Sequence, residues 1–298
     1  MPEIAAENEE AQRAWDGVLF DRFVHFRDLI VAGLSQFGED AFRRHPPPNG
    51  ARVLDIGCGF GDSSLRLGEL VGPDGSVLGV DVAPRFIEAA RADAATARAT
   101  NVRFEVCDVQ ATTFDETFDY AFARFGTMFF ASPVAALRNV RRALEPGSAL
   151  CMVVWRRRED NPWMYKAEQL LKPLVPVAEE TDEARCGPGP FSMANADTVS
   201  QILLGAGYER IAFERLDVPF LLGRDLDEAV DMNLALGPAA EAIRLAGDEG
   251  EALKPSLAAL LRGELEQFDT GDGVFATAST WIVTAQAPPA SSSASSSR

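Results

Sequence analysis

Apolar residues follow two different periods along this chain. Over residues 3–34, large apolar side chains recur at spacings of three and four, as on one face of an amphipathic helix. These are Trp15, Leu19, Phe23, Phe26 and Ile30. Gly17 lies inside this stretch and can interrupt it, and the prolines at 46–48 end it. The pattern predicts a helical N-terminal segment over residues 1–48, placed to act as a lid.

From residue 51 onwards, short apolar runs alternate with helical segments. Strands are predicted at 53–56, 77–80, 102–107, 118–123 and 149–155, with helices at 63–70, 84–98 and 133–144. Strands that alternate with helices form a parallel sheet covered on both faces. The sequence therefore predicts an α/β fold, with a doubly wound Rossmann-like sheet that begins in residues 51–157.

The alternation weakens after residue 157. A helix (196–206), a strand (208–220), a long helical stretch (225–268) and a final strand (274–285) follow. We predict helical insertions at 158–195 and 224–270, after the fifth and sixth strands, where they can cover a ligand at the carboxyl ends of the strands. Residues 1–287 then form a single domain, and the serine-rich end at 288–298 is expected to be a disordered tail.

Composition and net charge indicate which classes of partner the protein can bind. The 298 residues include 28 basic and 45 acidic side chains, a net charge of −17. Nucleic-acid binding needs a basic surface, so we expect no nucleic-acid partner. The first ten residues contain four glutamates and no basic leader, and no uncharged apolar run reaches the roughly 18 residues of a membrane span. We expect a cytoplasmic protein without a membrane partner, and a homo-oligomer is left open.

The cysteines predict neither disulfides nor a metal site. They lie far apart and never form a C-x-x-C pair, which fits reduced thiols. They are Cys58, Cys107, Cys151 and Cys186.

A glycine-rich turn is the most informative segment. Gly57, Gly59 and Gly61 follow the predicted strand 53–56 and precede a helix, so the backbone can turn sharply and approach a ligand closely. Gly61 comes too early for the G-x-G-x-x-G dinucleotide fingerprint, and the Lys-Ser/Thr of a P-loop is absent. The next residue is Asp62, and a carboxylate there suits a ligand with a cationic part better than a diphosphate.

Two further acids follow the next two predicted strands. Asp81 comes after 77–80, about twenty residues beyond the turn, where an acid can bind ribose hydroxyls. Asp108 comes after 102–107, where an ionised carboxylate can accept a hydrogen bond from an exocyclic base amine. Either acid alone is more often a solvated loop residue. Together they indicate an adenosine-containing ligand.

With these motifs the chain resembles the class I S-adenosylmethionine-dependent methyltransferases over about residues 52–155. The resemblance implies a seven-stranded sheet with an antiparallel last strand, S-adenosyl-L-methionine as methyl donor and S-adenosyl-L-homocysteine as product, and no metal. It places the methionine part of the cofactor near the turn, ribose after the second strand and adenine after the third. The implied residues are Asp55, Gly57, Cys58, Gly59, Gly61, Asp81, Val82, Asp108 and Val109. We also expect Arg124 to support the cofactor site rather than to contact phosphate.

A narrower likeness, to a bacterial subgroup that methylates small metabolites, is carried by segments such as 124–130 and 161–163. It implies a small-molecule acceptor of secondary metabolism, with an amine nitrogen preferred. Transfer to oxygen or carbon of an aromatic or quinone-like metabolite is the alternative. A nicotinamide-dependent oxidoreductase and a non-catalytic cofactor-binding module are the alternatives from other classes.

Methyl transfer from a sulfonium has a good leaving group, so positioning and desolvation supply much of the acceleration and a base is optional. The catalytic residue is therefore left unknown. His25 is the candidate base for a hydroxyl acceptor, with a structural or surface role as the alternative. Aromatic and apolar side chains are expected to enclose the acceptor and exclude water. Those predicted to line the pocket are Trp15, Phe20, Phe125, Met128 and Trp155.

Overall fold

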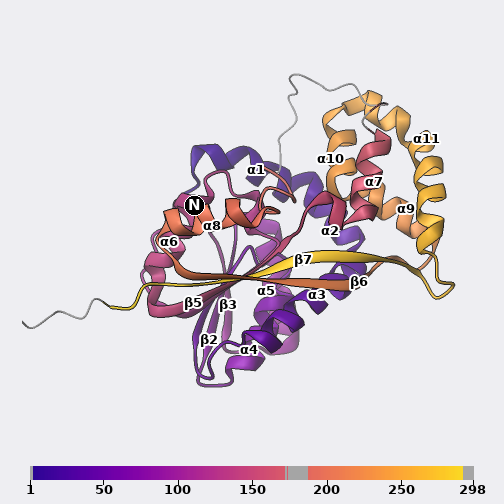
Figure 1. Cartoon of the computed structure of the whole chain (residues 1–298). Helices are drawn as coiled ribbons and strands as arrows, with labels where there is room; N and C mark the ends of the chain where they lie inside the picture. Colours follow the sequence, from indigo (N-terminus) through magenta and orange to yellow (C-terminus); the bar gives the residue numbers. More distant parts are fainter. Residues whose placement is uncertain (1–2, 172, 174–186, 291–298) are drawn as a thin grey trace, which may run out of the picture.

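A mixed β-sheet runs through the protein, whose computed structural model describes residues 3–171, 173 and 187–290. Its seven strands lie in the order β3-β2-β1-β4-β5-β7-β6 (Figure 1). Strands β1 to β5 pair in parallel, and β7 is antiparallel to both β5 and β6. The strands are β1 (Arg52–Ile56), β2 (Ser76–Asp81), β3 (Val102–Val106), β4 (Phe118–Arg124), β5 (Leu144–Trp155), β6 (Glu209–Gly223) and β7 (Val274–Gln286). The predicted seven-stranded sheet with an antiparallel last strand is confirmed.

Helices cover both faces of the sheet. Helices α3 (Arg27–Arg44), α4 (Asp62–Val71) and α5 (Pro84–Ala97) lie on one face, and α6 (Pro133–Ala143) and α8 (Ala196–Ala206) lie on the other (Figure 1). The chain winds from β1 to one side and from β4 to the other. In sheets of this type, the point where the winding direction reverses leaves a crevice at the carboxyl ends of the strands, and ligands bind there.

The apolar runs of the strands form the core. Phe118 and Phe122 of β4 and Leu54 and Ile56 of β1 are almost completely buried. Strands of a parallel sheet are covered on both faces, which explains why they read as continuous apolar runs rather than alternating ones. Burial of each such side chain contributes about 1.5–3 kcal/mol, so the sheet is a rigid base for the loops at its edge.

The N-terminal segment is helical, but it is not one helix. A 3-10 turn (Ala6–Asn8), α1 (Glu9–Ala14), a π-helical turn (Trp15–Leu19) and α2 (Phe20–His25) precede α3. Gly17, with φ −105° and ψ −117°, departs from helical geometry inside the π-helical turn. The interruption therefore occurs at the glycine that the sequence pattern singled out.

The two insertions pack on each other. Helix α7 (Pro162–Leu171) of the first contacts α10 (Gly237–Leu245) and α11 (Gly247–Leu265) of the second, and α9 (Leu226–Ala235) contacts β6 (Figure 1). The helical stretch expected over 225–268 consists of these three helices, α9, α10 and α11, and a 3-10 turn (Glu266–Phe268). Gly237 and Gly247 have φ of 79° and 58° at the two breaks, a left-handed conformation that glycine adopts most readily.

Some expectations fall outside the described residues. Cys186 and most of the expected tail, residues 291–298, lie there, while residues 288–290 are exposed and irregular. Cys58, Cys107 and Cys151 are buried free thiols. Among the described helices, none combines the length and apolar character that crossing a membrane requires.

Candidate cofactor site

The glycine-rich turn leads from β1 into α4 with all three glycines at positive φ. Gly57, Gly59 and Gly61 have φ of 65°, 53° and 80°. A Cβ atom on Gly57 would lie 3.0 Å from the Cα atom of Gly126, so the turn and the loop after β4 touch backbone to backbone. The turn thus depends on glycine both for its conformation and for close packing.

Asp55 lies beneath this turn and is almost completely buried. Its Oδ2 atom accepts hydrogen bonds from the hydroxyls of Ser63 at 2.7 Å and Ser64 at 2.6 Å. Burial raises the pKa of Asp55 to about 6, against the opposing effect of the two hydroxyls and of Arg124. Its Oδ1 atom is buried without a hydrogen-bond partner. A buried carboxylate oxygen without a donor fits a cationic ligand group such as an ammonium.

Arg124 supports the turn from the end of β4. Its side chain is 9% exposed, and its Nη2 atom lies 3.0 and 2.8 Å from the two carboxylate oxygens of Asp62, the first residue of α4. An acid at a helix N-terminus is favourable because the helix dipole is positive there. Arg124 therefore holds Asp62 at the start of α4, directly after the glycine turn.

Asp81 joins the turn to the loop after β2. Its Oδ2 atom accepts from the Gly59 N–H at 3.0 Å, and its Oδ1 atom accepts from the Ala83 N–H at 3.0 Å. Burial raises the pKa of this carboxyl group, although the backbone donors oppose the shift. An ionised carboxylate only accepts hydrogen bonds, which suits hydroxyl donors such as those of ribose. Val82 follows, and its carbonyl accepts from the Gln12 side chain at 3.2 Å.

Asp108 is buried after β3 and holds the N-terminal segment. Its Oδ2 atom accepts from the Ala5 N–H at 3.0 Å and from Asn8 Nδ2 at 2.8 Å, and its Oδ1 atom accepts from the Gln110 N–H at 2.9 Å. Val109, next in the chain, is also buried. The acids Asp55, Asp81 and Asp108 therefore belong to the ends of three adjacent strands, β1, β2 and β3.

Four of the five side chains predicted to line an acceptor pocket fall into two aromatic clusters. Trp15 and Phe20, from the N-terminal segment, pack on Phe86 with ring centroids 6.4 and 4.9 Å away. Phe125 stacks on Trp155 at 4.4 Å, and Phe37 of α3 packs against both rings. Met128 is buried in the core, and its sulfur accepts from the Trp155 N–H at 3.5 Å.

His25 is exposed at the end of α2, and its ring contacts Phe26 at 4.6 Å between centroids. This position matches the surface alternative rather than a base at the glycine turn. Within the described ranges, no group of three His, Cys, Asp or Glu side chains could hold a metal ion.

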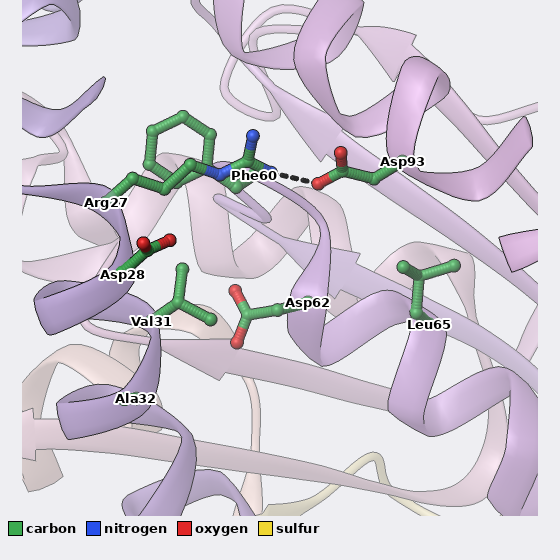
Figure 2. Close-up of a pocket in the computed structure, with 8 residues that line it drawn as sticks. All are labelled: Arg27, Asp28, Val31, Ala32, Phe60, Asp62, Leu65 and Asp93. Carbon is green, nitrogen blue, oxygen red and sulfur yellow. Dashed lines mark hydrogen bonds and ion pairs between the residues drawn. The ribbon is translucent and has the colours of Figure 1, made fainter. Parts of the chain in front are cut away.

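A cavity of about 400 Å³ lies on the outer side of the turn, between α3, α4 and α5 (Figure 2). The Arg27 guanidinium pairs with Asp93 and lies 4.5 Å from the centre of the Phe60 ring. The cavity lining is Arg27, Asp28, Val31, Ala32, Phe60, Asp62, Leu65 and Asp93. Since this lining contains none of the three strand-end acids, the cavity is separate from them.

Sequence reasoning missed the residues that hold these acids. Ser63 and Ser64 could have been found, because the first turn of a helix that follows a strand directly faces the end of that strand. Asn8 and Gln12 reach Asp108 and Val82 from 100 and 70 residues away, and no local pattern marks them.

Comparison with known proteins finds similarity over this part of the chain. Residues 48–198 match the family described as "Methyltransferase domain". The chain is 35% identical over 105 residues to aklanonic acid methyltransferase DauC of Streptomyces sp. (strain C5), covering 35% of this chain and 48% of that protein. It therefore spans about half the length of that relative.

Two further proteins extend the comparison. The ubiquinone/menaquinone biosynthesis C-methyltransferase UbiE of Azotobacter vinelandii is 30% identical over 177 residues, which cover 56% of this chain and 69% of that protein. The structure of Haemonchus contortus phosphoethanolamine N-methyltransferase 2 with S-adenosyl-L-methionine superposes with a TM-score of 0.56 at 18% identity. That match covers 96% of this chain and 60% of the other, and at this identity it shows a shared fold.

Proposed function

Since the chain belongs to the S-adenosylmethionine-dependent methyltransferase family, we propose that it transfers the methyl group of S-adenosyl-L-methionine to a small-molecule acceptor. The observation that carries this proposal is the arrangement of three acids at the ends of β1, β2 and β3 around the glycine turn. The unpartnered Oδ1 atom of Asp55 supports a ligand with a cationic group, as this cofactor has.

Each acid has a distinct role in this proposal. Asp55 and the glycine turn hold the methionine part, Asp81 with Val82 holds the ribose, and Asp108 with Val109 holds the adenine. When bound, the cofactor supplies an electrophilic methyl group with a thioether as leaving group. The residues of the chain bind and orient the cofactor and the acceptor, and they exclude water from the site. Such positioning and desolvation accelerate a displacement reaction.

An amine nitrogen is the proposed acceptor atom. A deprotonated amine needs only alignment with the methyl group, and the exposed position of His25 supports a reaction without an imidazole base. The stacked pair of Phe125 and Trp155 supports a flat or cationic acceptor, whereas Trp15 and Phe20 belong to the separate cluster on Phe86. Methyl transfer to a carbon atom of a quinone-like ring is the second candidate, supported by the similarity to the Azotobacter C-methyltransferase.

Calorimetry with S-adenosyl-L-methionine, S-adenosyl-L-homocysteine and NAD(H) tests the cofactor first. Labelled methyl donor with panels of amines, phenols and reduced quinones then tests the acceptor. Binding of NAD(H) alone would contradict the proposal. Binding of the methyl donor without transfer to any panel member would favour the non-catalytic module.

Replacing Asp81 by alanine is expected to weaken S-adenosyl-L-homocysteine binding by ~1–3 kcal/mol, since a ligand donor loses its half-buried acceptor. Asp74→Ala is the matched control, because Asp74 is an exposed acid at the opposite end of β2. The dissociation constants of both variants are compared with that of the parent by calorimetry. A constant unchanged by Asp81→Ala would refute the ribose assignment.

Replacing His25 by alanine is expected to leave turnover within about twofold of the parent, because an exposed imidazole cannot act as a base in a water-excluding site. Loss of a general base lowers turnover by roughly 10²–10⁴-fold. The measurement is steady-state turnover with the best acceptor, alongside cofactor affinity. A large loss of turnover at unchanged cofactor affinity would instead support His25 as the general base.

A further inference from the structure

The N-terminal segment Ala5–Gln12 contacts two of the three strand ends directly. Asn8 is 7% exposed, and its Nδ2 atom donates to Asp108 Oδ2 at 2.8 Å across 100 residues of sequence. The Ala5 N–H donates to the same oxygen at 3.0 Å. Gln12 donates to the carbonyl of Val82 at 3.2 Å, so the segment touches the loops after both β2 and β3.

Further contacts fasten the segment in place. Gln110 Nε2 donates to Glu7 Oε1 at 2.6 Å, and Gln110 Oε1 accepts from the Ser132 N–H at 3.0 Å. Asn8 is therefore held in a network that includes the loops following β3 and β4. Fixed surroundings of this kind orient a functional side chain more sharply than a free loop does.

The hydrogen-bond donors around Asp108 leave one acceptor position of its carboxylate free. A carboxylate offers about four acceptor positions, two on each oxygen. Ala5 and Asn8 fill both positions on Oδ2, and the Gln110 N–H at 2.9 Å fills one on Oδ1. A single position remains on Oδ1, with its direction set by the three donors that hold the carboxylate.

We propose that Asn8 is a positioning residue, which orients Asp108 toward the 6-amino group of adenine so that the N-terminal segment completes the base-recognition part of the cofactor site. The inference rests on the proposed function. Without the Asn8 donor, Oδ2 keeps only the Ala5 N–H, so the carboxylate is held less firmly, and the site loses affinity for the adenine amine and discrimination against bases that lack it.

The test compares two ligands on the full chain by calorimetry. S-Adenosyl-L-homocysteine carries the 6-amino group, and S-inosyl-L-homocysteine carries an oxygen in its place. Asn8→Ala is expected to weaken binding of the adenosyl ligand about tenfold and to change binding of the inosyl ligand by less than about twofold. Glu9→Ala, at the exposed neighbouring position, is expected to leave both constants unchanged.

Other outcomes separate the two proposals. Equal losses for both ligands would overturn the positioning role in favour of a general structural one, and tighter adenosyl binding would overturn it in favour of competition between the segment and the base. If Asn8→Ala does not fold, Asn8→Leu, which removes the donor without adding a charge and has a similar branched shape, takes its place. No binding of either ligand by the unaltered chain would contradict the proposed function, whereas identical behaviour of parent and variant would contradict this inference alone.

Discussion

Replacing Gly61 by alanine is expected to lower the free energy of unfolding by about 2–5 kcal/mol and to abolish measurable cofactor binding. A left-handed conformation costs a non-glycine residue about 1–2 kcal/mol, and Gly61 has φ 80°. A Cβ atom there would also lie 2.7 Å from two ring atoms of Phe104 and 2.9 Å from Ala90 Cβ. Overpacking of this kind adds about 1–3 kcal/mol, and relief of the contact must shift the turn.

Gly147 provides a matched control for this substitution. Its φ is 85°, and no atom lies within 4 Å of a Cβ built there. Gly147→Ala therefore carries the conformational penalty of about 1–2 kcal/mol without the clash. Denaturant unfolding of both variants, with S-adenosyl-L-homocysteine affinity measured on each, separates the two effects. Equal losses of stability would show that the packing of the turn against Phe104 is unimportant.

The turn and the sheet could be predicted because their signals are local. Buried parallel strands read as apolar runs, and the left-handed positions of Gly57 and Gly61 require glycine in the sequence itself. Asp81 and Asp108 could be placed because the ends of neighbouring parallel strands share one edge of the sheet. One break within the C-terminal helical stretch also has a local signal, the dipeptide Gly237-Pro238 between α9 and α10.

What could not be predicted depends on contacts between distant segments. The aromatic residues were expected to form one enclosure, yet Trp15 and Phe20 pack on Phe86 while Phe125 and Trp155 pack on Phe37. The sequence does not indicate which surface an apolar side chain packs against, because hydrophobic burial is non-directional. Asn8 was missed for a related reason: its partner Asp108 lies 100 residues away.

The ionised Asp55 carboxylate is expected to destabilise the folded chain and to strengthen cofactor binding. Burial raises its pKa from an ordinary 3.8 to about 6 in the folded chain, although the Ser63 and Ser64 hydroxyls and Arg124 favour its charged form. A raised carboxyl pKa contributes stability that is complete below about pH 4 and is lost as the pH rises through 6. A pKa rise from 3.8 to about 6 corresponds to roughly 3 kcal/mol of folding free energy.

Replacing Asp55 by asparagine is therefore expected to raise the free energy of unfolding at pH 7.5 by up to about 3 kcal/mol, with little change at pH 4. The amide oxygen can still accept from Ser63 and Ser64, but an NH₂ group replaces the unpartnered Oδ1 atom. Loss of one partner of a buried ion pair costs about 3–5 kcal/mol, so the affinity for S-adenosyl-L-homocysteine should fall more than about 100-fold.

The pH dependence of binding identifies the group responsible. In the parent chain, affinity for S-adenosyl-L-homocysteine should decrease as the pH falls below 6, because the ligand ammonium then meets a protonated Asp55. In Asp55→Asn the weaker affinity should be flat over the same range. Calorimetry on both proteins between pH 5 and 8, with denaturant unfolding at each pH, measures both effects. An identical pH profile in the variant would assign the titration to another group, and a destabilised variant with parental affinity would contradict the role of the unpartnered oxygen.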